Sequence, residues 1–159
     1  MPRYLGIDPG LSGALAIVET INGLPVLADA IDMPSTGVGA KARVDIIAAA
    51  KWIGKHAPSA AYVERAQAFP GQGASSGFSY GRAVGALEAV VALCAIPMIL
   101  VEASVWKRQL RLPGKDKEAA RQRALQLFPS QHALFARKRD HGRAEAALIA
   151  LAGVNHGPA

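Results

Sequence analysis

The stretch YLGIDPGLSGALAIV, from Tyr4 to Val18, sets the start of the fold because it holds two apolar runs joined by a short turn. The first run ends at the carboxylate of Asp8, and Pro9-Gly10 follows at once. Apolar runs that flank a Pro-Gly turn predict a β-hairpin, here with strands over 3–8 and 13–19. A carboxylate at the end of such a strand is either a turn former or part of a functional site.

The rest of the chain alternates between strand-like segments and segments with helical periodicity. The pattern predicts further strands over 24–33, 60–65 and 96–103, and helices over 45–55, 80–94, 105–110, 115–128 and 141–154. A meander followed by alternating helices and strands predicts an α/β fold with a five-stranded mixed sheet. Three antiparallel strands would come first and parallel strands next, with helices on both faces. No linker or repeat interrupts the pattern, so we expect one domain over 1–159.

Composition narrows the class of protein. Hydrophobic residues make up 51% of the 159 residues and charged ones 19%, which is typical of a globular protein. No apolar run approaches the ~20 residues of a membrane span, and the N-terminus lacks the pattern of a signal peptide. The single cysteine, Cys94, excludes an internal disulfide and a Cys-based metal site. We therefore expect a cytoplasmic protein with no membrane partner.

The positive charge is concentrated in one part of the sequence. The net charge is +6, but the segment from Ala103 to Arg143 holds eleven basic and three acidic residues, which leaves the remainder slightly negative. Such a basic region favours a polyanion partner, most simply nucleic acid, although a solvated surface without a partner is the alternative. Candidate DNA contacts in or near this region are Arg108, Lys115, Arg121, Lys138 and Arg139.

A second acidic residue, Glu64, lies near the end of the predicted strand 60–65. If this strand and 3–8 are adjacent and parallel, the carboxylates of Asp8 and Glu64 meet at one edge of the sheet. Two like charges there repel each other unless a proton or a cation lies between them. Taken alone, each acid could equally be a turn residue or a solvated strand end.

The segment DHGRAEAALIAL, 140–151, supplies further acids. Glu145 lies inside an apolar, alanine-rich helix, where an unpaired buried carboxylate would be costly. His141 is four residues earlier and therefore on the same side of the helix. Asp140 precedes the first turn, so it is either an N-cap or a ligand, and His141 is either a surface residue or part of the site.

Carboxylate oxygens are typical ligands of Mg²⁺ or Mn²⁺. Two such ions ~4 Å apart can bind the attacking water and the leaving oxygen of a phosphodiester. The sequence therefore predicts a two-ion site with Asp8, Glu64, Asp140 and Glu145 as ligands, and with His141 as a further catalytic candidate.

Three motifs in this order, GIDPGLSGALA, YVER and DHGRAEAALIAL, make the chain resemble the RuvC-type Holliday junction resolvases, especially their bacteriophage and prophage relatives. The resemblance spans nearly the whole chain. It implies an RNase H-like fold and a homodimer that makes paired nicks in four-way DNA junctions with divalent metal. Asp8 and Glu64 match the first two acids of the family, and Glu145 matches the last, where Asp is usual. The protein would act in the cytoplasm of a bacterium, or of a phage host.

The sequence departs from the family at one position. The other helix group, usually Asp or His, lies three residues before the last acid, and Gly142 stands there. Either Asp140 or His141 must then supply this group; helical geometry favours His141, and charge favours Asp140. The resemblance also implies DNA contacts for Lys107 and Lys117, and stacking of an aromatic residue, Phe69, at the junction centre.

The helix 80–94 carries an apolar stripe and, on a neighbouring face, Gly81 and Gly85. It either supplies the dimer interface, with the glycines allowing close approach, or packs inside the monomer. Two other functions remain open from the sequence: an RNase H-like nuclease for RNA–DNA hybrids or other branched DNA, and a non-catalytic DNA-binding protein of the same fold.

Overall fold

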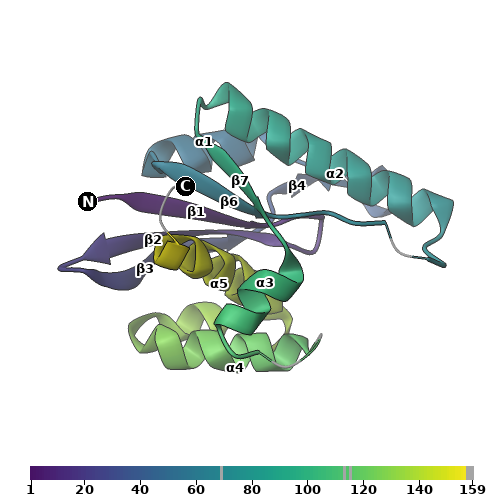
Figure 1. The fold of residues 1–159 in the computed structure, drawn as a ribbon. Helices are drawn as coiled ribbons and strands as arrows, with labels where there is room; N and C mark the ends of the chain where they lie inside the picture. The colour runs from purple at the N-terminus through teal and green to yellow at the C-terminus, as the bar shows by residue number, and fades with distance from the viewer. Residues whose placement is uncertain (69, 113, 115, 157–159) are drawn as a thin grey trace.

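The computed structural model describes residues 1–68, 70–112, 114 and 116–156, and its centre is a five-stranded mixed sheet (Figure 1). The strands are β1 (Arg3–Asp8), β2 (Ala14–Ile21), β3 (Leu24–Asp32), β6 (Ala60–Glu64) and β7 (Met98–Val101). Their order in the sheet is β3-β2-β1-β6-β7. The first three strands pair antiparallel, whereas β6 is parallel to both β1 and β7. The predicted fold class and strand order are confirmed.

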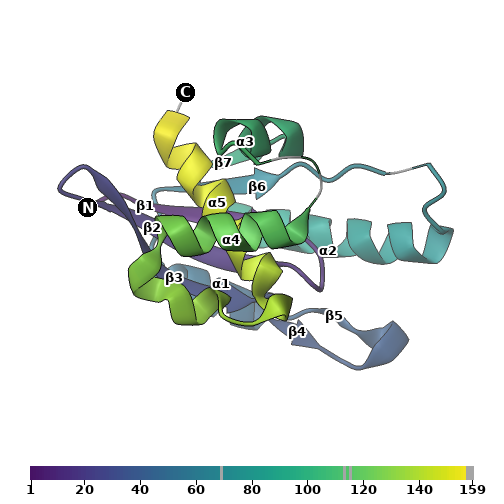
Figure 2. The same cartoon turned by 90° about the horizontal axis from the view of Figure 1, so that it is seen from below.

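Helices cover both faces of this sheet, as Figures 1 and 2 show. One face packs against α1 (Ile46–His56) and α2 (Ala74–Leu93). The other packs against α3 (Ala103–Gln109), α4 (Lys117–Leu127) and α5 (His141–His156). None of the helices among the described residues has both the length and the apolar character to span a bilayer.

Short elements complete the chain where the sequence predicted only loops. The strands β4 (Ser35–Thr36) and β5 (Arg43–Val44) pair as a small hairpin around a 3₁₀ helix, Gly39–Lys41. Two more 3₁₀ helices, Pro129–Phe135 and Lys138–Asp140, lead from α4 to α5. Elements of two to seven residues have too little periodicity to be recognised in a sequence.

The helix α5 is buried on all sides because it lies between the sheet and α4 (Figures 1 and 2). Its alanines at 144, 146, 147 and 150 are all fully buried. The small side chains permit close contact with the sheet, and Gly6 of β1 completes it: a Cβ atom there would overlap the carbonyl oxygen of Ala146. At its N-terminal end, Arg143 binds the Asp32 carboxylate of β3 with two contacts of 2.7 and 2.8 Å. The close packing against β1 and the ion pair with β3 therefore both hold α5 in its position on the sheet.

The apolar stripe of α2 packs inside the monomer. Leu87 and Val91 are buried in the cluster that contains Leu5 and Ile7 of β1, and Val84 is also buried. Gly81 and Gly85 lie on the exposed side, where an added Cβ atom would meet no other atom within 4 Å. The stripe is thus used by the monomer, and the glycine face is left open.

Candidate active site

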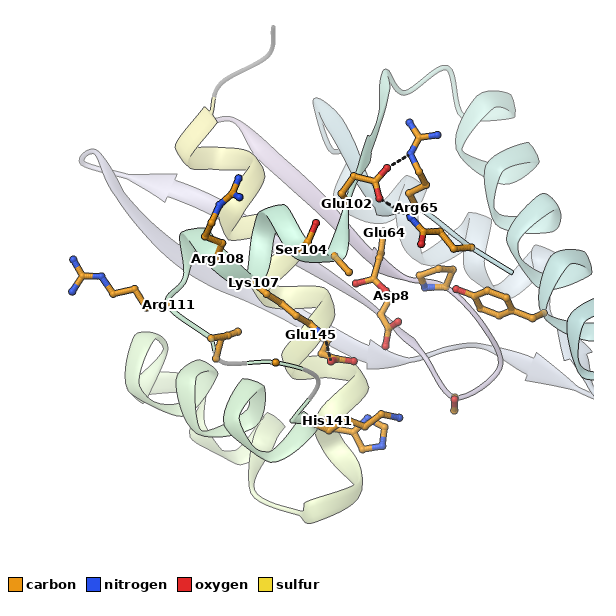
Figure 3. Close-up of a pocket in the computed structure, with 18 residues that line it drawn as sticks. Asp8, Glu64, Arg65, Glu102, Ser104, Lys107, Arg108, Arg111, His141 and Glu145 are labelled. Atoms are coloured by element: carbon orange, nitrogen blue, oxygen red, sulfur yellow. Dashed lines mark hydrogen bonds and ion pairs between the residues drawn. The ribbon is translucent and has the colours of Figure 1, made fainter. Parts of the chain in front are cut away.

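The first two predicted acids lie at the same edge of the sheet. Ile7 of β1 is in register with Val63 of the parallel strand β6, so Asp8 and Glu64 come next to each other as the two strands end. Figure 3 shows the two carboxylates side by side at the edge of the sheet where these strands end. The predicted juxtaposition is confirmed, and it follows directly from parallel pairing of the central strands.

The third carboxylate comes from a helix rather than from the end of a strand. Glu145, in the second turn of α5, lines the same cleft of about 1240 Å³ as Asp8, Glu64 and His141. Lys107 of α3 extends toward it (Figure 3), with 3.7 Å between Lys107 Nζ and Glu145 Oε1. Strand ends and a buried helix therefore hold three acids at one place.

The charges of these acids disturb one another. Burial raises the pKa of Asp8 well above its ordinary value, and the charges of Glu145 and Glu64 raise it further. Burial also raises the pKa of Glu64, against which a hydrogen bond from Trp106 acts. The raised pKa values show that the nearby positive charge does not balance the negative charges of these clustered carboxylates.

Basic side chains form the wall of the cleft on the α3 and α4 side. Lys107, Arg108 and Arg111 come from α3 and the residues just after it, Lys117 begins α4, and Arg65 follows Glu64. The charges of Lys117 and Lys107 both act to lower the pKa of Asp8, so they lie within electrostatic reach of the acids. Acidic side chains next to basic side chains suit a ligand that carries both phosphate groups and a bound cation.

Comparison with known proteins supports the fold. The sequence matches no protein-family model and no curated protein. A structure of Thermus thermophilus RuvC matches with a TM-score of 0.69 at 19% identity, over 96% of this chain and 93% of that one. T. thermophilus RuvC in complex with Holliday junction substrate matches with a TM-score of 0.70 at 18% identity, over 96% and 92%. The chain has a RuvC-type fold.

Within this RuvC-type fold, Asp140 has a structural position that differs from the predicted one. It is 1% exposed, does not line the cleft, and accepts hydrogen bonds from the backbone N–H and the guanidinium of Arg137 at 2.8–3.2 Å. Burial acts to raise its pKa, but the bonds from Arg137 hold that pKa below the ordinary value. Asp140 thus closes the capping box of the 3₁₀ helix Lys138–Asp140, and this position does not support the predicted role of Asp140 as a metal ligand.

His141 rather than Asp140 reaches the cleft. Its imidazole lines the pocket with Glu145, and its Nδ1 atom is buried without a hydrogen-bond partner among the described residues. Gly142 cannot be replaced by a ligand residue without rearrangement, because a Cβ atom there would lie 2.9 Å from the carbonyl oxygen of Ser12. The tight contact between α5 and the turn after β1 explains the glycine at this position.

The predicted DNA contacts divide into three groups. Lys107, Arg108 and Lys117 line the cleft. Lys138 and Arg139 are exposed in the 3₁₀ helix before α5, away from the residues that line it. Phe69 and Lys115 lie outside the described residues.

Arg121 has a different role from the predicted one. It binds Glu118 at 2.6 and 3.0 Å and donates to the carbonyl oxygens of Phe135 and Ala136. Its guanidinium thus joins α4 to the following 3₁₀ helix. Most N–H donors of Arg121 are already bound within the chain, so its position does not support the predicted DNA contact.

Several residues of the cleft were missed by sequence reasoning. Glu102 follows β7 just as Asp8 ends β1, so the rule of acids at strand ends could have found it. Arg65 binds one Glu102 oxygen at 2.6 Å, and Gln67 donates to the other at 2.9 Å. Tyr80 lies on the α2 stripe but lines the cleft, where burial and the charges of Glu64 and Asp8 raise its pKa to about 12.

The donor set fits a hard divalent cation. Three carboxylates and the side chain of His141 line one cleft, and carboxylate oxygens suit Mg²⁺ or Mn²⁺. Among the residues that the structure describes, no three Asp, Glu, His or Cys side chains stand close enough to hold one ion together. A single ion shared by all three acids would therefore require them to move closer together.

Proposed function

We propose that this protein is a metal-dependent, structure-selective endonuclease that resolves Holliday junctions by paired, symmetric nicks. The observation that carries the proposal is the convergence of Asp8, Glu64 and Glu145 on the floor of a cleft with a basic wall. T. thermophilus RuvC, which shares the fold, was solved with Holliday junction substrate, and this supports the choice of substrate.

In this proposal Asp8, Glu64 and Glu145 hold two Mg²⁺ ions, with Mn²⁺ as a substitute and His141 as a further donor. Such a pair supplies an activated water and stabilises the leaving oxygen of a phosphodiester. Burial of the acids strengthens every electrostatic interaction among them. The raised pKa of Asp8 supports this assignment, because it marks a place where added positive charge lowers the free energy.

The basic residues would bind and orient the DNA backbone. Lys107 pairs with Glu145 in the absence of DNA and lies where an incoming phosphate oxygen could replace that carboxylate as its partner. Arg108 and Lys117 extend the positive wall beside it. Contacts of this kind position the substrate without reading its sequence, which agrees with recognition of a branched structure.

Paired nicks require two active sites in a fixed relation, and we propose that a homodimer provides them. The exposed side of α2 supports this, because Gly81 and Gly85 allow close approach and Phe78 and Leu93 leave apolar surface open on the same helix. A cytoplasmic location agrees with the single free cysteine.

The test is to incubate the protein with a labelled four-way junction, with and without Mg²⁺, and to map nicks on all four strands. Symmetric paired nicks that require the metal are expected, and Asp8→Asn should abolish them while junction binding remains. Preferential cleavage of an RNA–DNA hybrid or of another branched DNA would instead assign a different RNase H-like nuclease. Binding without any metal-dependent nicking would assign a non-catalytic DNA-binding protein.

A further inference from the structure

Trp106 occupies an unusual position for a buried aromatic residue. Its side chain is fully buried in the cluster formed by α3, α4, α5 and one face of the sheet. Its indole N–H nevertheless reaches the edge of the cleft and donates to Glu64 Oε2 at 2.7 Å. A buried indole N–H needs an acceptor, and here that acceptor is a carboxylate of the candidate site.

The chemistry of this contact is restrictive. The indole N–H is a single donor on a rigid ring with no acceptor, so it binds one carboxylate oxygen from one direction only. A hydrogen bond of 2.7 Å to an ionised acceptor is at the strong end of the range. The bond fixes the rotation of the Glu64 carboxylate and leaves Oε1 uncommitted by Trp106.

The same ring also supports a cation. Lys107 Nζ lies 5.1 Å from the centroid of the Trp106 ring, within the range of a cation–π interaction. Lys107 in turn approaches Glu145 at 3.7 Å. The Trp106 ring therefore contacts two residues of the cleft. Its N–H edge binds Glu64 of β6, and its face lies against Lys107, which in turn approaches Glu145 of α5 (Figure 3 shows Glu64, Lys107 and Glu145).

We propose that Trp106 is the positioning residue of the site: through its indole N–H it holds the Glu64 carboxylate in the orientation that binds the divalent ion. This inference rests on the proposed metal-dependent function. Trp106 itself is fully buried, so we expect it to act on the ion through the Glu64 carboxylate. Partners that orient a metal ligand commonly contribute about 10- to 100-fold to metal affinity or activity.

The test removes the N–H and keeps the shape. The chain has two tryptophans, and Trp52 lies in α1 on the opposite face of the sheet, so Trp52→Phe leaves Trp106 as the only one. In this background, Trp106 is replaced biosynthetically by benzothienylalanine, in which sulfur stands for the N–H group. The matched control is the Trp52→Phe protein with ordinary tryptophan. Trp106→Phe serves as a second variant with the same loss of donor.

Mn²⁺ affinity is measured by titration calorimetry, together with junction affinity without metal and thermal unfolding. We expect Mn²⁺ affinity and the cleavage rate to fall about 10- to 100-fold, with junction affinity unchanged because Trp106 is buried. Unchanged Mn²⁺ affinity and cleavage in the analogue, beside an active control, would overturn the inference alone. A control protein that neither binds Mn²⁺ nor cleaves any junction would overturn the proposed function and this inference with it.

Discussion

Two acidic regions meet at the start of α5, and the pKa values of their buried carboxyl groups are shifted in opposite directions. Asp140 is almost completely buried, and the neighbouring Arg137 satisfies both of its oxygens, so its pKa lies below the ordinary value. Five residues later, Glu145 joins Asp8 and Glu64 around one cleft, where burial and like charge raise the pKa of Asp8.

The difference separates an acid whose charge is balanced within the chain from the acids that we propose bind metal. A structural carboxylate has its partner within the chain, whereas the cleft carboxylates share Lys107 as a counter-charge and repel one another.

The largest effect is expected for Glu145→Gln, which keeps the shape of the side chain and removes its charge. Metal-dependent cleavage should fall by more than about 100-fold, because a ligand is lost rather than a residue that orients one. Thermal stability should stay equal or rise, since repulsion with Asp8 and Glu64 is relieved. Cleavage kinetics and calorimetric melting check this, and a large drop in the melting temperature would assign Glu145 to the fold instead.

Asp140→Asn should show the reverse pattern. Removing one partner of a buried charged pair should cost about 2–3 kcal/mol of unfolding free energy, with the half-exposed Arg137 limiting the loss. Cleavage per folded molecule should change less than about twofold. Urea unfolding combined with active-site titration separates the two quantities, and a loss of activity as large as that of Glu145→Gln would restore Asp140 as a ligand.

Gly142→Ala tests the close contact between the start of α5 and the turn after β1. The new Cβ atom would meet the Ser12 carbonyl oxygen at 2.9 Å, so we expect about 1–2 kcal/mol of destabilisation despite the better helix propensity of alanine. The matched control is Gly54→Ala in α1, where the Cβ atom meets nothing within 4 Å and stability should rise by up to about 1 kcal/mol. Equal effects in both variants, measured by thermal unfolding, would show that the contact imposes no constraint.

The smallest effect compares two cations of α4. Lys117→Gln should weaken junction binding several-fold and lower the slope of log affinity against log salt by about 1. Arg121→Gln should leave that slope unchanged and lower the melting temperature slightly, because its donors bind Glu118 and two carbonyl oxygens. Salt titrations of junction binding check both, and identical slopes for the two variants would contradict the division.

The sequence was sufficient for the contacts that regular structure dictates. Parallel pairing of strands at 3–8 and 60–65 brought Asp8 beside Glu64, and helical spacing brought His141 to the side of Glu145. These inferences succeeded because period and chain connection leave few alternatives.

The sequence was insufficient where irregular segments choose the partners. Asp140 and Glu145 are both acids near the start of one helix, and only the 3₁₀ turn before α5 shows that Arg137 binds the former. Trp106 meets Glu64 across 42 positions of sequence, through the tilt of α3 on the sheet, which periodicity does not encode. The Glu118–Arg121 pair has the same i,i+3 spacing as Arg137–Asp140, but it lies inside the predicted helix 115–128 and could therefore have been recognised.

The buried position of α5 has a consequence for the order in which the molecule becomes active during synthesis. Domains fold as units while the chain emerges from its N-terminus at about 5–20 residues per second. Asp8 and Glu64 emerge early, but Glu145 and the rest of α5, which packs on one face of the sheet together with α3 and α4, emerge only after Asp140. A nascent chain that lacks α5 has neither the third carboxylate nor a fully covered sheet, so the proposed site can assemble only after α5 has been synthesised and has packed.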